Sequence, residues 1–228
     1  LLAHEIDKFL IAREGSLLNK LIAIGGVAQT ESFEIQVKSH LPQAINAEAF
    51  VAPLLDDERV QVVRKSYYRQ YDTYFTFLDE SQGRVRYRED DALNAEGEVT
   101  GVRMRLTYTA PSKEREFDRA VLLSRSQFIA PATRPLRFYR EYFRPNGEHE
   151  VQKTRHRWHI LYKGVLFYLN VDDIIVPQVG GTFVEIKSQT WSKRDAEYKA
   201  SLVSELLTLL GVTEEMRVHK EYIELATT

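Results

Sequence analysis

Charged residues at every second position along many short segments constrain the fold of this 228-residue chain more than any other feature. In an extended strand, residues two apart point to the same face, so each such segment has one charged face and one apolar face. The segment 84–89 shows the pattern, because its three arginines alternate with Val85 and Tyr87. Similar segments follow one another along most of the chain, which predicts a large antiparallel sheet.

The period-two segments and the turn-rich stretches between them predict eight or so strands. We expect these strands at residues 33–38, 66–76, 84–89, 101–109, 115–121, 136–143, 151–159, 165–170 and 182–188. Many short strands with few helices are typical of an antiparallel barrel, so the predicted fold class is α+β.

Helical spacing of apolar residues occurs in only a few places. It predicts a leading helical segment within residues 1–30, a short helix over 44–55 and a helix that Ser192 caps. We also expect a short helix at 124–129. The predicted organisation is therefore a leading helical segment followed by one sheet-rich domain over 31–228.

The composition narrows the class of protein. The chain has 31 Lys and Arg against 33 Asp and Glu, a formal charge of −2, so broad wrapping of nucleic acid is not expected. No apolar run is long enough for a spanning helix, so we expect no membrane partner either. The absence of cysteine removes disulfides, thiolate catalysis and Cys-ligated zinc, and it suits a cytoplasmic protein. Nothing in the sequence indicates the oligomeric state.

The charged strand faces are dominated by arginine and lysine. Neighbouring cations repel one another unless an anion lies among them, and the guanidinium fork matches phosphate oxygens. The ordinary interpretation of one such strand is a solvent-exposed face opposite a core. Five in succession instead favour a barrel with a charged interior, which suits a polyanion with or without a divalent metal ion. The five columns are Glu34-x-Gln36-x-Lys38, Arg84-x-Arg86-x-Arg88, Arg103-x-Arg105, Lys153-x-Arg155-x-Arg157 and Glu185-x-Lys187.

Three further motifs lie between the columns: Tyr71-Asp72-Thr73-Tyr74-Phe75, Leu106-Thr-Tyr-Thr-Ala-Pro111 and Val171-Asp172-Asp173-Ile174. In their order along residues 32–210, the columns and these motifs resemble the CYTH superfamily, the triphosphate tunnel metalloenzymes. That superfamily includes thiamine triphosphatases, inorganic triphosphatases and class IV adenylate cyclases. The resemblance implies an eight-stranded antiparallel β-barrel, or tunnel, with flanking helices.

The resemblance also implies roles for individual residues. Glu34 and Glu185 are expected to bind Mg²⁺ or Mn²⁺, with Asp172 close to them, and the expected catalytic residues are Lys38, Glu34 and Glu185. The expected partner is a small molecule that contains a triphosphate, either nucleoside, thiamine or inorganic, which the protein hydrolyses with the metal. The expected substrate-binding residues are Lys38, Arg86, Arg88, Arg105, Lys153, Arg155 and Lys187.

The chain departs from the superfamily's motifs at three positions. Gln36 and Lys187 stand where the motifs have a second glutamate, and Thr109 stands where they have a lysine. Together the changes add two positive charges, which is the charge of one divalent ion. Lys187 could thus stand where a metal would otherwise lie, which leaves phosphate binding with weak or absent metal-dependent turnover. In the alternative, one metal ion persists on Glu34 and Glu185, because Mg²⁺ often needs only one or two carboxylates.

Three functions stay open at this point: a metal-dependent triphosphatase, a class IV-type adenylate cyclase, and a non-catalytic triphosphate-binding module of a larger kinase-like protein. The tail at 218–225 and the leading helix also resemble CYTH modules fused behind a uridine-kinase-like domain. Because the chain begins with Leu1, we keep open that it is a piece of a longer protein.

The alternation of charged and apolar residues predicts which side chains face away from the tunnel. We interpret the acidic run 89–91 as a solvated turn and Trp158 as a packing residue. The side chains expected outside the tunnel, beneath helices, are Ile35, Val37, Val85, Tyr87, Leu106, Val184 and Ile186.

Overall fold

The computed structural model of the chain describes residues 16–25, 30–109, 115–117, 121–123, 127–190 and 192–226. In these ranges the chain forms ten strands, five helices and two short 3₁₀ turns. The strands are β1 (Thr30–Leu41), β2 (Val60–Thr76), β3 (Arg84–Leu93), β4 (Val99–Thr109), β5 (Arg115–Phe117), β6 (Val121–Leu123), β7 (Gln127–Pro131), β8 (Gly147–Tyr162), β9 (Val165–Val176) and β10 (Thr182–Thr190). The helices are α2 (Leu17–Gly25), α3 (Ala47–Leu55), α4 (Leu136–Phe143), α5 (Lys193–Leu209) and α6 (Tyr222–Ala226), and the turns are η1 (Glu80–Gln82) and η2 (Glu214–Met216).

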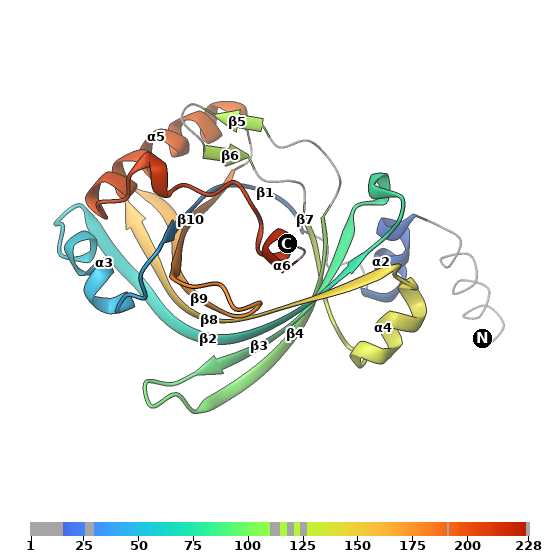
Figure 1. Cartoon of the computed structure of the whole chain (residues 1–228). Coiled ribbons are helices and arrows are strands. Elements are labelled where there is room, and N and C mark those ends of the chain that lie inside the picture. Colours follow the sequence, from blue (N-terminus) through green and yellow to red (C-terminus); the bar gives the residue numbers. More distant parts are fainter. Residues whose placement is uncertain are drawn as a thin grey trace.

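Eight of the strands pair into a closed ring, which Figure 1 shows in a view through its opening. The order around the ring is β1, β10, β9, β8, β2, β3, β4 and β7, and every pair in it is antiparallel. β1 closes the ring because Thr30–Ser32 pair with β7 and Phe33–Leu41 pair with β10. The predicted eight-stranded antiparallel tunnel with flanking helices, of class α+β, is confirmed.

Two elements differ from their predicted type. Residues 136–143, expected as a strand, form helix α4, and residues 127–131, which overlap the end of the expected helix 124–129, form strand β7. The segment 136–143 is rich in aromatic residues that favour strands, but its buried Tyr139, Tyr142 and Phe143 lie three to four positions apart, which is helical spacing. Packing of that one face therefore selects the helix, and β7 takes the place in the ring between β4 and β1.

The segment expected as one strand over 115–121 contributes two short strands instead. β5 and β6 pair with each other, and β6 pairs with Ile35 and Gln36 of β1, so this hairpin lies outside the ring of eight. The residues between the two strands, 118–120, are outside the described ranges, as are 124–126 of the predicted short helix. The other predicted strands are present and extend further at one or both ends.

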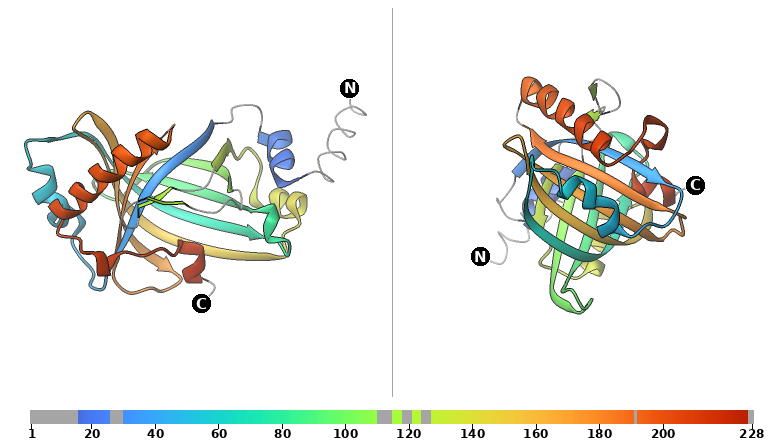
Figure 2. Two further views of the ribbon diagram at one scale, coloured as in Figure 1. Left: turned by 90° about the horizontal axis from the view of Figure 1, so that it is seen from above. Right: turned by 90° about the vertical axis from the view of Figure 1, so that its left-hand side faces the viewer.

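The outer face of the ring is apolar and is covered by two groups of helices on opposite sides (Figure 1 and Figure 2). On one side, α3 and α5 pack over Ile35, Val37, Val184 and Ile186 of β1 and β10. On the other side, α2 and α4 pack over Val85, Tyr87 and Leu106 of β3 and β4. All seven side chains are at most 2% exposed, so the predicted outward orientation is confirmed.

Two helices, α3 and α5, begin where their sequence indicates. Ser192 caps α5 as predicted, because its hydroxyl accepts a hydrogen bond from the backbone N–H of Asp195. α3 falls within the predicted range 44–55, and Asn46 caps it in the same way through Ala49. None of the described helices is both long and apolar enough to cross a membrane.

Of the predicted leading segment 1–30, the structure describes Ser16, α2 and Thr30, the first residue of β1. Leu17 and Leu21 of α2 are buried in the cluster that also holds Val85 and Tyr87. α2 is therefore part of the packing of the sheet, and the division of the chain at residue 30 stays a prediction.

The C-terminal segment reaches into one opening of the ring (Figure 1). The backbone N–H of Val218 donates to the carbonyl oxygen of Lys38 at 2.9 Å, which attaches the segment to β1. Beyond this point, Tyr222 and Ile223 of α6 are buried in a third apolar cluster. The other buried members come from the inner face of the ring: Tyr74, Val151, Ile174 and Phe183. The segment therefore fills an apolar end of an otherwise charged tunnel.

Gly181, directly before β10, provides a test of the ring closure. Its φ is +85°, and a Cβ added there would lie 2.1 Å from the carbonyl oxygen of Leu41 at the end of β1. We expect Gly181→Ala to lower the free energy of unfolding by about 3 kcal/mol, because backbone strain and overlap add. Gly97 is a matched control, since its φ is +82° and a Cβ there would meet nothing within 4 Å.

For Gly97→Ala we expect a loss of only about 1 kcal/mol, from the backbone conformation alone. Urea unfolding of both variants measures the difference. Equal losses would mean that the close approach of Gly181 to β1 does not contribute to closing the ring.

Candidate functional site

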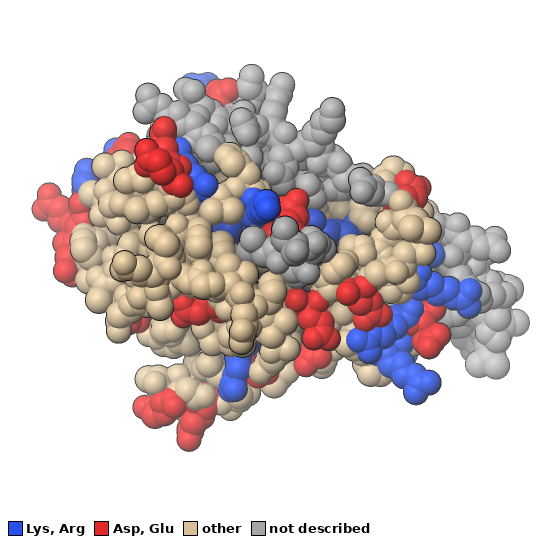
Figure 3. Space-filling view, viewed as in Figure 1, with Lys and Arg blue, Asp and Glu red and all other residues tan. Residues whose placement is uncertain are grey.

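A cavity of about 260 Å³ lies inside the ring, and most of its lining is charged. Eight cationic and three acidic side chains line it, together with polar groups, three tyrosines and Ile129. Figure 3 shows Lys and Arg atoms gathered in the hollow at the centre of the face that carries the C-terminus. The cavity therefore brings together nine of the ten residues that the sequence predicted for the site: Glu34, Lys38, Arg86, Arg88, Arg105, Lys153, Arg155, Glu185 and Lys187.

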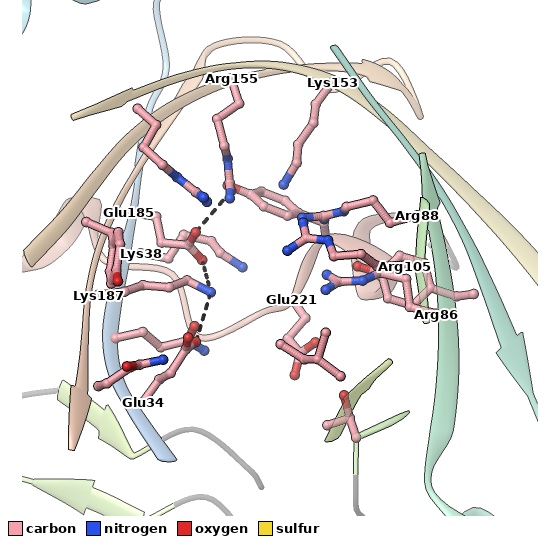
Figure 4. A pocket seen from close by; sticks show the side chains of 18 residues that line it. Glu34, Lys38, Arg86, Arg88, Arg105, Lys153, Arg155, Glu185, Lys187 and Glu221 are labelled. Carbon is pink, nitrogen blue, oxygen red and sulfur yellow. Dashed lines mark hydrogen bonds and ion pairs between the residues drawn. The ribbon is translucent and has the colours of Figure 1, made fainter. Parts of the chain in front are cut away.

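The register of the strands arranges these side chains as two walls that face each other (Figure 4). Arg86, Arg88 and Arg105 come from β3 and β4, where Arg88 pairs with Arg105 across the two strands. The opposite wall comes from β1 and β10, where Lys38 pairs with Glu185 and Gln36 with Lys187. Lys153 and Arg155 of β8 lie between the two walls.

A buried carboxylate holds Arg88 in place. Asp72 of β2 accepts hydrogen bonds from Nε and Nη2 of Arg88 at 2.5 Å each, and Nε of Arg86 lies 3.9 Å from the same carboxylate. Burial by itself would raise the pKa of Asp72, but the charges of Arg88 and Arg86 outweigh it and hold this pKa well below its usual range. The carboxylate is thus ionised at neutral pH and orients the guanidinium of Arg88. Sequence reasoning quoted Asp72 within a motif but gave it no role.

Asp172 does not line the cavity, although the sequence predicted it near the metal ligands. It is completely buried and accepts hydrogen bonds from Nε and Nη2 of Arg155 at 2.6 and 2.5 Å. Nζ of Lys153 lies at 3.3 Å, and the hydroxyl of Tyr222 donates to it at 2.7 Å. Burial would raise the pKa of Asp172, yet the charges of Arg155 and Lys153 hold it far below its usual range. Both carboxylate oxygens are therefore already engaged with cations and a hydroxyl.

The acidic run 89–91 is not a solvated turn, so that prediction is wrong. It lies within β3, where the alternation turns Asp90 inward and leaves it 2% exposed. Its carboxylate accepts from Arg105 at 2.6 Å, from Gln70 at 2.5 Å and from Arg103 at 3.5 Å. Burial lowers the pKa of Arg105 to about 9 despite the charge of Asp90. The signal in the sequence was the position of Asp90 in the same column as Arg86 and Arg88.

Lys187 lies between the two glutamates that the resemblance implied as metal ligands. Its Nζ is 3.3 Å from Oε1 of Glu185 and 3.7 Å from Oε2 of Glu34. Glu185 also contacts Nη2 of Arg155 at 3.1 Å. Positive and negative side chains therefore alternate in the order Arg155, Glu185, Lys187 and Glu34 (Figure 4). Burial would raise the pKa of Glu185, but Lys187, Arg155 and Lys38 lower it overall. Among the described residues, no three His, Cys, Asp or Glu side chains gather in a way that could hold a metal ion.

The C-terminal segment contributes groups that sequence reasoning missed. Glu221 lines the cavity and forms an ion pair with Arg84, and the ring of Tyr222 lies 4.0 Å from Nζ of Lys38 and 4.1 Å from Nζ of Lys153. Burial lowers the pKa of Lys38, against the charges of Glu185 and Glu221, and lowers that of Lys153 still further. The adjacent apolar residues Tyr222 and Ile223 indicated in the sequence that this segment packs against the protein. They did not indicate which surface of the sheet it packs against.

Arg157 is a further cation in the cavity, and it has no carboxylate partner within ion-pair distance in the part of the chain that the structure describes. Its Nε donates to Oδ1 of Asn170 at 2.7 Å, and its guanidinium lies 5.8 and 5.9 Å from the ring centres of Tyr68 and Tyr168. Burial and the nearby charge of Arg155 lower the pKa of Arg157 to about 10. It stands in the same sequence column as Lys153 and Arg155, so the alternation alone could have included it.

The described interior of the ring carries an excess of positive charge. The eight cations of the cavity and Arg84 beside it face six carboxylates, which leaves three positive charges. The six carboxylates are Glu34, Glu185 and Glu221 in the lining and Asp72, Asp90 and Asp172 behind it. An anion with several charges would offset this excess.

Comparisons with known proteins show likenesses in structure only. No protein-family profile matches the chain, and no curated protein matches it. The PH1819 protein from Pyrococcus horikoshii OT3 is 20% identical with a TM-score of 0.57, over 84% of this chain and 97% of its own. A candidate adenylate cyclase from Vibrio parahaemolyticus is 15% identical with a TM-score of 0.57, over 87% of this chain and 100% of its own.

A conserved hypothetical protein from Pyrococcus furiosus is 22% identical with a TM-score of 0.52, over 84% of this chain and 99% of its own. At these identities the likenesses show the fold alone. They cover nearly the whole length of each matched chain and more than four fifths of this one, so they concern most of the fold. Together with the closed ring of eight antiparallel strands, they show that this chain shares its fold with these three proteins.

Proposed function

We propose that the tunnel binds a small molecule through its triphosphate group. The observation that supports this most directly is the convergence of eight cationic side chains on one cavity whose surroundings keep three positive charges in excess. Phosphate oxygens are matched by guanidinium forks and ammonium groups, and a linear polyphosphate can meet cations on both walls at once.

The buried carboxylates prepare the arginines for this role. Asp72 engages Nε and Nη2 of Arg88. Asp172 engages the same two atoms of Arg155, whose Nη2 also contacts Glu185. Within the described part of the chain, Nη1 of each arginine is left for a ligand in the cavity. Because these orientations exist before the ligand arrives, little reorganisation is needed on binding. Each charge-assisted hydrogen bond to phosphate is expected to contribute about 1.5–3 kcal/mol.

We extend the proposal to hydrolysis of the terminal phosphate. The opposed cations would neutralise the charge that develops on the transferred phosphoryl group and on the leaving oxygen. Glu34 faces the cavity, and Lys187 is its one ion-pair partner among the described residues, so we assign Glu34 to orienting the attacking water. On the same wall, Lys38 keeps its predicted role in phosphate binding, and we assign Glu185 to positioning Lys187 instead of binding a metal.

A second candidate function is cyclisation of ATP, because the chain shares its fold with a candidate adenylate cyclase. In that reaction the ribose 3′-hydroxyl loses its proton and attacks the α-phosphorus, the bond to the bridging oxygen breaks, and pyrophosphate leaves. The described part of the lining gives little support for a base, since Ile129 is the one apolar residue in it. Two of the three tyrosines in this part, Tyr74 and Tyr222, belong to the apolar cluster at the end of the tunnel. We therefore place inorganic triphosphate first among the ligands to be tested. The cytoplasmic location expected from the composition stays a prediction.

Substitution of Arg86 tests the proposed binding site. Arg86 lines the cavity, and its buried Nε has no hydrogen-bond partner in the described part of the chain. We expect Arg86→Ala to weaken the binding of inorganic triphosphate by about 10- to 100-fold, because a charge-assisted contact is lost. Arg103 is the matched control, since it belongs to the neighbouring column but its side chain is 62% exposed.

For Arg103→Ala we expect a change of about threefold or less, as for an exposed ion pair. Isothermal titration calorimetry measures both affinities. In parallel, release of phosphate is measured with ATP, thiamine triphosphate and inorganic triphosphate, and formation of cyclic AMP is measured with ATP. Equal effects of the two substitutions would contradict a binding site inside the ring. Tight binding without turnover would favour a non-catalytic module.

The buried pair of Asp172 with Arg155 predicts a large effect on stability. Asp172→Asn removes the charge that Arg155 and Lys153 share, and we expect the free energy of unfolding to fall by about 3–5 kcal/mol. Asp173→Asn is the control, because Asp173 is exposed on the other face of β9. Urea unfolding measures both. Saturating inorganic triphosphate should recover part of the loss in Asp172→Asn, since the ligand supplies negative charge to the same cations.

The buried lysines predict that binding takes up protons at alkaline pH. Burial lowers the pKa of Lys153 and of Lys38 in the free protein. A bound polyanion favours their charged forms and raises both values, so the affinity should fall as the pH rises from the free-state pKa towards the bound-state pKa. Calorimetry near pH 9, in buffers of different ionisation enthalpy, counts the protons, and Lys153→Met should take up fewer. No uptake in either protein would contradict the placement of the ligand beside these lysines.

A further inference from the structure

We propose that the ammonium group of Lys187 takes the place of a divalent metal ion, so that the tunnel binds its triphosphate without metal. This inference rests on the proposed function, because it concerns how the same cavity balances the charge of that ligand. It differs from what the fold family implies, which is a metal ion held by Glu34, Glu185 and neighbouring acids.

The position of the ammonium group is the first argument. Nζ of Lys187 lies 3.3 Å from Glu185 and 3.7 Å from Glu34, so it stands between the two carboxylates expected to share a metal (Figure 4). An ammonium has three donors. Here it forms ion pairs with both carboxylates, and because Lys187 also lines the cavity, it can donate to a phosphate oxygen as well.

The remaining donors around this point do not complete a metal site. Gln36, which pairs with Lys187 across β1 and β10, supplies a neutral amide where a second acid would be needed. Asp172 is behind the lining, and its oxygens are engaged by Arg155, Lys153 and Tyr222. A divalent ion at Glu34 and Glu185 would therefore have few oxygen ligands and would lie close to a lysine charge that repels it.

The charge of the whole lining is the second argument. The interior already has three more positive than negative charges, with Lys187 included. A divalent ion in these sites most often neutralises phosphate charge that the protein does not. Here the chain itself supplies positive charge from both walls. Lys187 places one of these positive charges beside Glu34 and Glu185, where the metal ion would lie.

The first experiment uses inorganic triphosphate and calorimetry, once with a chelator and once with excess Mg²⁺. We expect the unmodified chain to bind with affinities that agree within about threefold in the two conditions. Lys187→Met should lose about tenfold or more of the metal-free affinity, since one charge-assisted contact is removed. Lys65→Met is the control, because Lys65 is 46% exposed outside the tunnel and pairs with Glu48. It should change nothing.

The second experiment creates the missing metal site and measures metal binding directly. The double substitution Gln36→Glu and Lys187→Glu places four acidic side chains at one point of β1 and β10, with a local change of three negative charges. Titration with Mn²⁺, followed by electron paramagnetic resonance in the absence of triphosphate, should show a bound ion in this variant and none in the unmodified chain. Circular dichroism verifies that the variant is folded. If it does not fold, the Lys187→Met titration still decides.

The outcomes separate this inference from the proposed function. If the unmodified chain binds triphosphate only when Mg²⁺ is present, or binds Mn²⁺ by itself, Lys187 does not replace a metal, although the tunnel still binds phosphate. Metal-free binding that Lys187→Met leaves unchanged would overturn the inference too. If no triphosphate binds in either condition, the proposed function itself fails.

Discussion

Pairing between buried carboxylates and arginines inside the ring is the interaction on which the rest of the structure depends. Asp72, Asp90 and Asp172 each accept hydrogen bonds from at least one arginine, and all three are at most 2% exposed. Without them, the cations of neighbouring strands would repel one another in a space that water reaches poorly. The same pairs fix the direction of each guanidinium, so the structural requirement and the proposed binding function are met by one arrangement.

The charged interior is possible because the apolar core lies outside the ring. α3 and α5 on one side, and α2 and α4 on the other, bury the outward faces of the strands, so the sheet does not need an apolar interior for stability. The exception is the end where Tyr222 and Ile223 meet inward apolar side chains. There the C-terminal segment also brings Glu221 beside Arg84, which adds negative charge to the cationic lining.

Lys187 is the residue at which the proposed function departs most from the metal-dependent chemistry that the sequence resemblance implies. A lysine between two glutamates holds the wall of β1 and β10 together through ion pairs. In the proposed role it also presents a fixed positive charge to the ligand, without any requirement for a metal. The proposed catalytic residues then act through charge and position alone, which is how phosphoryl transfer is promoted in general.

The amino-acid sequence by itself determined which face of each strand is charged, because the two-residue period of a strand is a local property. It thereby placed nine of the ten predicted site residues in the cavity. The tertiary structure alone decided which side chains meet. The register of β1 against β10 sets Lys187 between Glu34 and Glu185. The pairing of β3 with β2 and β4 brings Gln70 and Arg105 to Asp90. Packing made 136–143 a helix, although its aromatic residues favour a strand, and it gave the C-terminal tail its place in the tunnel. These outcomes depend on contacts between residues far apart in the chain, which no local pattern encodes.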